Sequence, residues 1–583
     1  MTAPLRPAAL APVRSLTRRA RPAPLLLELD LSRGVLESPP ADPLGALRAR
    51  QVPSLRTVLE RLRAAADETS VVGLVAHVGP DVLSPAQVEE VGRAVEAFAK
   101  AGKHTACWTE SFGELGSGTL PYHLAVHFDE LWVQPSASVG LVGVATRGVF
   151  LRGALDRLGL EPQIGQRHEY KSAADTIVRE SMSDAQREAT QRLADSVTEQ
   201  VVATVSRRRD LSPEQVRAAI DGAPLNATAA LEHRLVDRIG YRDELYADLR
   251  RRLGRPGDGP PELRLRYVHR WNPSSRRQAR ALAARRHRPV VAVVAVEGGI
   301  ALGRSGSSPL GGRRAGSDTV CAALRAAASR ADVKAVVLRV VSPGGSYVAS
   351  DAIHREVLQV RSTGKPVVAS MGTVAASGGY FVAMPADEVL ALPSTVTGSI
   401  GVLGGKVVVG EALRRVGIGT EPVGSGEHAV MFDPTRRFDD DEWRRVETWL
   451  DEVYDDFTRK AAAGRGLPYE RLEPLARGRV WTGADAYQLG LVDTLGGLPA
   501  AVECAARRAG LQPDRVRVQP LPHVTPFDRL RAAESSDSPA AAGASGLLAP
   551  AGAGLDGTLT GLWEAHGGPG AGVLSVPGDW RLR

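Results

Sequence analysis

Two serines in the second half of the chain are surrounded by small residues in a way that suits chemistry. Ser377 stands in AASGGY and Ser399 in TGSIGV, and glycine lies beside each of them. A serine on a tight turn can act as a nucleophile, but its hydroxyl is weak unless a positioned base accepts the proton. No histidine lies close to either serine in the sequence, so the base has to come from elsewhere in the chain.

We expect Lys171, in the segment HEYKSAAD of the first half, to be that base. Lysine accepts a proton only when it is neutral, so its pKa must fall from about 10.4, and burial is the main means of lowering it. Arginine could not replace it, because the guanidinium group keeps its proton in proteins. Only 7 of the 73 basic residues are lysines. In a chain this rich in arginine, a lysine that is kept can indicate a specific role.

Acyl transfer also needs backbone N–H groups that point at the oxyanion of the tetrahedral intermediate. The diglycine Gly344-Gly345 in SPGGS and the amide of Gly378, directly after Ser377, are the candidates. Ser399 is expected to hydrogen-bond Lys171 and to hold its amine towards Ser377.

The elements that must position these residues follow an α/β pattern. Short apolar runs such as VVAVVAVEG and VKAVVLRVV alternate with segments of helical period, which favours stacked βαβ units. The chain also resembles itself, because HFDELWVQPSASVGLVGV parallels PADEVLALPSTVTGSIGV, and LVD occurs in both halves. We therefore expect two related domains, 24–250 and 289–515, joined by a basic linker, 251–288, and flanked by disordered ends, 1–23 and 516–583.

The two halves differ where the chemistry would be. The alignment puts Thr119 opposite Ser377 and Leu141 opposite Ser399, so the first half lacks both serines. Conversely, Met431 stands opposite Lys171. The sequence thus predicts a site divided between the halves, with the base from the first and the nucleophile from the second.

Four motifs in order, YKSA, SPGGS, AASGGY and TGSIGV, resemble the signal peptide peptidase A family, also called protease IV, in its long duplicated form. The resemblance covers about 24–515. It implies a crotonase-like, Clp-protease-like βαβ spiral in each half, with Ser377 as nucleophile and Lys171 as general base. It further implies homotetramers and peptide substrates that include remnant signal peptides. It implies no cofactor and no metal.

Three alternatives stay open at this point. A crotonase-like enzyme acting on acyl-CoA thioesters would use a similar pair of oxyanion amides, although that class relies on acidic residues for proton transfer. A Clp-type Ser-His-Asp peptidase would need a histidine about 25 residues after the serine, but that region contains none, and His428 is the next one available. A non-catalytic oligomeric scaffold would be expected to lose candidate catalytic residues from both halves. Here the first half keeps the lysine, and the second half keeps the serines and glycines.

Composition indicates the cellular compartment in which the protein is expected to work. Three separated cysteines (Cys107, Cys321 and Cys504) form neither a disulfide framework nor a metal pattern, which favours a reducing cytoplasm. The sequence has no signal-peptide core and no apolar run of about 20 residues, so any membrane contact is expected to be peripheral, at the inner face of the cell membrane. The net charge of +7 gathers in the arginine-rich linker, which we interpret as solvated rather than as a nucleic-acid or lipid site.

Overall fold

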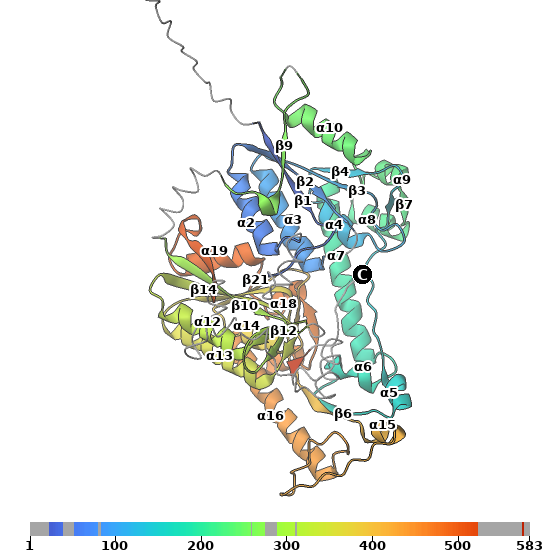
Figure 1. Cartoon of the computed structure of the whole chain (residues 1–583), viewed down its shortest axis with the longest axis vertical. Coiled ribbons are helices and arrows are strands. Elements are labelled where there is room, and N and C mark those ends of the chain that lie inside the picture. Colours follow the sequence, from blue (N-terminus) through green and yellow to red (C-terminus); the bar gives the residue numbers. More distant parts are fainter. Residues whose placement is uncertain are drawn as a thin grey trace, which may run out of the picture.

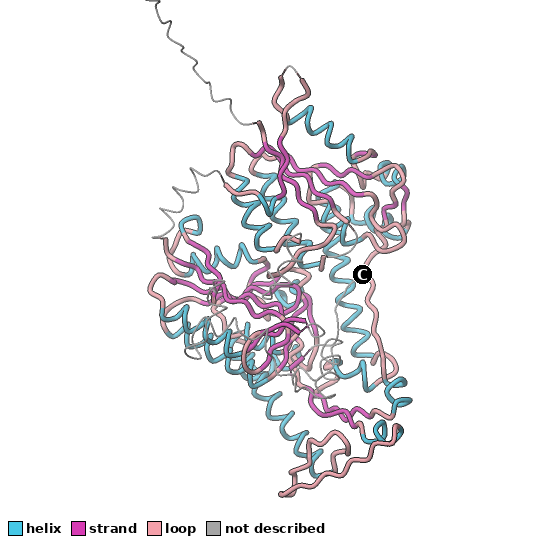
Figure 2. The backbone as a smooth tube through the Cα atoms, in the orientation of Figure 1, coloured by secondary structure: helices cyan, strands magenta, loops and turns pink. Residues whose placement is uncertain are grey.

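The structure is a computed structural model that describes residues 23–38, 52–79, 83–257, 259–273, 288–308, 312–522 and 574–575. Each half of the chain builds one twisted, mainly parallel sheet with helices packed against it, so the expected α/β class is confirmed (Figures 1 and 2). The first sheet, in blue and green, lies above the second sheet in Figure 1.

The first sheet has the strand order β8-β4-β3-β2-β1-β9. Its central strands are mostly buried, because helices cover both faces of the sheet. The strands are β1 (Leu25–Asp30), β2 (Val71–His77), β3 (His104–Thr109), β4 (Glu130–Val133), β8 (Arg238–Ile239) and β9 (Arg264–Tyr267). The helices of this half are α2 (Leu55–Ala66), α3 (Pro85–Lys100), α4 (Thr119–Ala125), α8 (Pro213–Asp221), α9 (Ala227–Glu232) and α10 (Arg242–Leu253).

The second sheet repeats this plan in the order β21-β17-β16-β14-β10-β22, and β18 and β20 extend it further from the end of β16. Its strands are β10 (Val290–Glu297), β14 (Val333–Ser342), β16 (Val367–Ala376), β17 (Glu388–Ala391), β18 (Val396–Gly398), β20 (Val480–Thr482), β21 (Thr494–Leu495) and β22 (Arg517–Leu521). The helices are α12 (Ser317–Ser329), α13 (Tyr347–Ser362), α14 (Gly378–Ala383), α17 (Tyr469–Leu472), α18 (Gly483–Gln488) and α19 (Leu498–Arg508). A small separate sheet contains β11 (Gly299–Ala301), β12 (Gly306–Ser308), β13 (Gly312–Gly316), β15 (Gly344–Gly345) and β23 (Leu574–Ser575).

The shared LVD motif performs the same structural task in both halves. The carboxylate of Asp237 accepts a hydrogen bond from the Leu131 N–H at the start of β4, at 2.7 Å. The carboxylate of Asp493 accepts one from the Val389 N–H in β17, also at 2.7 Å. Equivalent aspartates therefore satisfy equivalent strand amides, as expected of an internal duplication.

Two strands extend the sheets beyond the expected domain limits. β9 lies within the expected linker 251–288 and pairs with β1 in parallel. β22 begins just after residue 515, within the expected tail 516–583, and pairs with β10. The described residues do not include 1–22, most of the remaining linker (258 and 274–287) or most of the tail. The expectation of disorder in the two ends of the chain concerns residues outside the described ranges.

The halves are interlocked rather than merely adjacent. β6 (Glu161–Gln166) of the first half pairs in antiparallel register with β19 (Leu403–Val408) of the second. α7 (Asp184–Arg209) then returns to the first half, and α16 (Asp440–Arg465) packs below the second sheet (Figure 1). Other short elements here are β5 (Ser138–Val139), α5 (Arg152–Leu158), α6 (Asp175–Val178), β7 (Leu225–Asn226) and α15 (Gly410–Arg415). Among the described helices, even those of 26 residues lack the apolar character needed to cross a bilayer.

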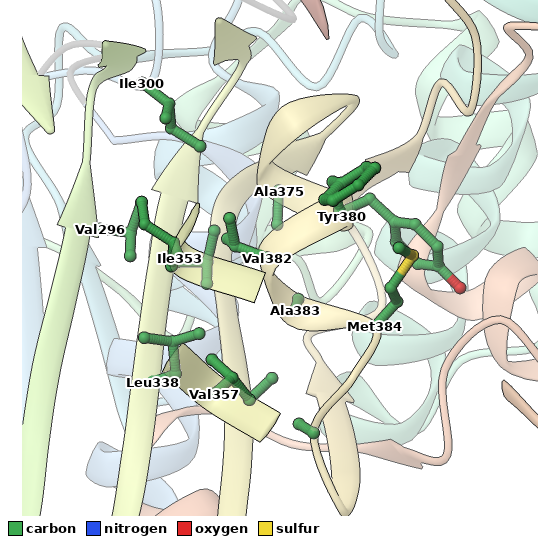
Figure 3. Close-up of a cluster of buried hydrophobic side chains, with 14 of the residues drawn as sticks. Val296, Ile300, Leu338, Ile353, Val357, Ala375, Tyr380, Val382, Ala383 and Met384 are labelled. Atoms are coloured by element: carbon green, nitrogen blue, oxygen red, sulfur yellow. The ribbon is translucent and has the colours of Figure 1, made fainter. Parts of the chain in front are cut away.

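The core beneath the glycine-flanked serine is densely packed. Figure 3 shows Tyr380 and Val382 of α14 within a cluster that includes Ile353 of α13 and Leu338 of β14. All six residues of α14 are buried. A buried helix with apolar neighbours cannot shift easily, so the turn that precedes it is held in one position.

Candidate active site

Ser377 occupies a sharp turn between the end of β16 and the start of α14. Its backbone has φ 55° and ψ −117°, a combination that L-residues rarely adopt. The turn is held by the Ser377 N–H, which donates to the Gly398 carbonyl at 2.8 Å, and by the buried helix that follows. Strained backbone of this kind persists where the surroundings enforce it, and it clusters at functional sites.

Lys171 reaches this serine from the other half of the chain. Its Nζ donates to Ser377 Oγ at 2.8 Å, across 206 residues of sequence. The same amine lies 3.1 Å from Ser399 Oγ and 3.3 Å from the Ser399 carbonyl oxygen. The three residues predicted from the sequence to meet are therefore brought together.

The amine of Lys171 sits in an environment that disfavours its charge. The residue is 1% exposed, and burial lowers the pKa of its amine to about 7. Its hydrogen-bond partners are hydroxyl and carbonyl oxygens of uncharged groups. At neutral pH a substantial fraction of the amine is thus uncharged and able to accept a proton.

The segment that carries Lys171 is positioned by strand pairing and by two glycines. β6 and β19 pair just before it, and Lys171 then begins the short 3₁₀ turn Ser172–Ala174. A Cβ atom on Gly478 would lie 2.5 Å from the Cβ of Lys171, and one on Gly401 would lie 3.2 Å from its Cδ. These glycines were not among the residues predicted from the sequence. Gly401 lies within TGSIGV and could have been found there, whereas no motif marks Gly478.

The candidate oxyanion glycines lie against each other. A Cβ on Gly378 would be 3.1 Å from the Gly344 Cα and 3.2 Å from the Gly345 nitrogen. The Gly344 N–H already donates to Ser342 Oγ at 3.1 Å. Gly344 is therefore the weakest of the three expected donors, which leaves Gly345 and Gly378 as the pair next to Ser377.

The counterpart positions in the opposite halves have other roles. Thr119, opposite Ser377, donates from Oγ1 to the Gly143 carbonyl at 2.7 Å. Met431, opposite Lys171, is buried and contributes its carbonyl to the Lys406 amine. Among the described residues, no histidine is a hydrogen-bond partner of Ser377. The His428 ring instead lies near the carboxylates of Glu427 and Asp441.

Comparison with known proteins identifies the family of the chain. The model of "Peptidase family S49" matches residues 98–254 and 359–512, one region in each half. "Protease 4" of Salmonella typhi is 32% identical over 508 residues, which cover 83% of this chain and 78% of that protein. "Serine protease SPPA, chloroplastic" of Arabidopsis thaliana is 31% identical over 79% of this chain and 66% of that protein. "Protease 4" of Haemophilus influenzae is 31% identical over 81% of this chain and 76% of that protein.

Fold, site and relatives together define a serine peptidase built on a duplicated α/β fold. The chain belongs to peptidase family S49, as the resemblance to the protease IV family predicted. This assignment favours peptide hydrolysis over the two other functions considered, acyl-CoA chemistry and a purely structural role.

Proposed function

We propose that the protein is an endopeptidase in which Ser377 is the nucleophile and Lys171 is the general base. The observation that carries this proposal is the 2.8 Å contact between Lys171 Nζ and Ser377 Oγ, made by an amine whose pKa is lowered to about 7. A base must lie within hydrogen-bond reach of the proton that it removes, and its pKa should lie near the working pH. Both conditions are met by Lys171.

The chemistry follows from these positions. Neutral Lys171 accepts the hydroxyl proton as Ser377 Oγ attacks the carbonyl carbon of the scissile peptide bond. The N–H groups of Gly345 and Gly378 stabilise the negative oxygen of the tetrahedral intermediate. Protonated Lys171 then gives its proton to the leaving amine, and an ester to Ser377 remains. Water hydrolyses that ester with Lys171 again as the base, which regenerates the free serine.

Ser399 has a positioning role in this scheme. Its hydroxyl and its carbonyl oxygen both accept hydrogen bonds from the Lys171 amine, at 3.1 and 3.3 Å. These contacts restrict the rotation of a long side chain that carries large rotamer freedom. The amine is thereby kept pointed at Ser377.

We further infer that the substrates are peptides such as remnant signal peptides. The support is the resemblance to the signal peptide peptidase A family and the relatives named as proteases. Cleavage of a peptide library, read by mass spectrometry, tests this point. Preference for apolar peptides would support it, and selective cleavage of charged sequences would contradict it.

The assignment of the nucleophile is tested with Ser377→Ala. Removing a catalytic serine costs at least about 10⁴-fold in kcat, because the residual rate comes only from binding and the oxyanion hole. Thr119→Ala, at the equivalent position of the first half, is the matched control and should retain activity. Substantial hydrolysis by folded Ser377→Ala protein would overturn the proposal.

We also propose that the protein forms homo-oligomers through the arm that carries α5 and α15. Several apolar side chains on this arm face solvent: Leu158 is 59% exposed, Val416 71%, Val423 94% and Phe432 72%. Gathered apolar exposure of this kind marks interaction surfaces. The arm lies at the far end of the molecule from the first sheet (Figure 1).

Light scattering after size exclusion tests the oligomer. The wild type should show a multiple of the monomer mass, and the double variant Val423→Asp/Phe432→Asp should shift towards the monomer. Leu115→Asp, which changes a fully exposed leucine of the first half, should leave the mass unchanged. A monomeric wild type would contradict the proposal.

A further inference from the structure

The C-terminal tail returns to the candidate active site. After β22 the chain runs through 51 residues between Pro522 and Leu574, and it then forms β23 at the edge of the small sheet. β23 pairs with β15 in antiparallel register, with Ser575 opposite Gly344 and Leu574 opposite Gly345. These two glycines form the loop that the sequence analysis assigned to the oxyanion.

Local sequence explains why both partners suit this pairing. The tail there reads AGVLSVPG, an aliphatic run bounded by glycine and proline, which is typical of a short strand. β15 consists of glycine alone and pairs with β11 on its other side, where a Cβ on Gly345 would lie 2.1 Å from the Ile300 carbonyl oxygen. Its free edge therefore presents N–H and C=O groups with no side chain of its own, as sites of strand addition do.

The paired strand lies on the loop that is proposed to bind the oxyanion. Gly378, the residue after Ser377, approaches Gly344 and Gly345 so closely that a Cβ on Gly378 would be 3.1 Å from the Gly344 Cα. A strand on the free edge of β15 is thus paired with the same two residues that pack against Gly378, the residue after the proposed nucleophile. In this arrangement Ser377 is 0% exposed and Lys171 is 1% exposed, although a substrate must reach the serine.

We propose that the tail, through Leu574–Ser575, is an intramolecular peptide ligand of the β15 edge and competes there with substrates. The inference rests on the proposed function, because it takes the β15 edge to be the substrate position. The tail binds by main-chain pairing, so its occupancy depends on the N–H groups of the paired residues. A peptide in solution has to displace it before Ser377 can attack.

The first experiment measures hydrolysis of a short fluorogenic peptide by the full chain carrying Leu574→Pro/Ser575→Pro. Proline removes both N–H donors from the pairing segment, and these positions lie outside the two main sheets. We expect kcat/KM to rise about tenfold, because a tethered strand near a millimolar effective concentration exceeds a dissociation constant of about 0.1 mM by that factor. The kcat at saturating peptide should be unchanged.

The control variant is Leu547→Pro/Leu548→Pro, which places two prolines elsewhere in the same tail and should behave as the wild type. Equal kcat/KM for all three proteins would overturn the proposal. A rise in both proline variants would also overturn it, because the effect would then not belong to Leu574–Ser575. Loss of activity in Ser377→Ala is a separate result, so failure of the proposed function is recognised independently.

A binding experiment in the Ser377→Ala background needs no catalysis. The probe is a fluorescent peptide with the sequence of residues 570–579, GAGVLSVPGD, read by anisotropy. Protein with an intact tail should bind it about tenfold more weakly than protein carrying Leu574→Pro/Ser575→Pro, by the same effective-concentration argument. A probe with proline at both paired positions should not bind. Equal binding to the two proteins, or binding of the proline probe, would overturn the proposal.

Discussion

The role proposed for Lys171 depends on the surroundings of the residue rather than on its type. An exposed lysine remains charged at neutral pH, and the chain places this one in a buried position, where charge is poorly solvated. The neighbouring hydroxyl and carbonyl groups of Ser399 orient the amine without adding a negative charge that would raise its pKa. A carboxylate in place of Ser399 would favour the ammonium form and would weaken the base.

The pH dependence of kcat/KM follows from this pKa. Only neutral Lys171 can accept the proton, and the neutral fraction grows as pH rises through about 7. We expect kcat/KM to rise about tenfold per pH unit below that value and to level off above it. Lys171→Met and Lys171→Arg should both remove nearly all activity, since neither residue can act as a base.

The controls for the pH profile are His168→Gln and His428→Gln. Both should keep the rising limb, because neither histidine bonds to Ser377. The profiles are measured on one peptide with protein shown to be folded. A limb that disappears with His428→Gln, or a wild-type profile for Lys171→Arg, would identify a different base.

At the level of elements, the site depends on short strands that have no room for side chains. β15 passes so close to β11 that Gly345 adopts φ +148° and leaves no space for a Cβ. The same two-residue strand abuts Gly378 at the start of α14. The separation of the two candidate oxyanion donors is thus set by backbone packing.

Gly345→Ala should therefore disable the site without unfolding the second sheet. The added methyl group would force β15 away from Ile300, and losing one aligned oxyanion donor costs about 10²–10³-fold in kcat. Gly299→Ala on the adjacent β11 is the control, because a Cβ there meets nothing within 4 Å. Steady-state kinetics on both variants make the comparison, and near wild-type kcat for Gly345→Ala would contradict this account of β15.

At the level of the whole molecule, a buried ion cluster holds the two halves together. Arg339 of β14 donates to Glu37 at 2.7 Å and to Glu90 of α3 at 2.8 Å, and it is only 4% exposed. Both carboxylates belong to the first half, so this contact fixes α3 on the second sheet. The divided site needs this rigidity, because Lys171 and Ser377 come from different halves.

Arg339→Met should destabilise the protein by about 3–5 kcal/mol, since it leaves buried carboxylates without their partner. Adding Glu90→Gln should recover part of that loss by removing one unpaired charge. Arg459→Met removes an exposed helical ion pair and should change stability by less than about 1 kcal/mol. Thermal and denaturant unfolding measure all three variants. Equal effects of Arg339→Met and Arg459→Met would show that the buried cluster is not important for stability.

Much of the fold and the three residues of the candidate site could be predicted from local pattern. Strand-length apolar runs, the repeated LVD and the glycine-flanked serines are properties of neighbouring residues, so the α/β class, the duplication and the asymmetry between halves follow from them. The lysine was found because the repeat supplies an internal comparison, Lys171 against Met431. The edge strands β9 and β22 were missed, because their pairing partners lie far away in the chain.

Only the tertiary structure decided how these residues meet. The distance between Lys171 and Ser377, the burial that lowers the pKa of the amine and the need for glycine at Gly478 all depend on segments separated by hundreds of residues. The pairing of the tail with β15 also depends on distant segments, since the local sequence AGVLSVPG does not predict which strand it pairs with. Local sequence determines which conformations a segment can adopt, whereas solvation and proximity are properties of the packed molecule.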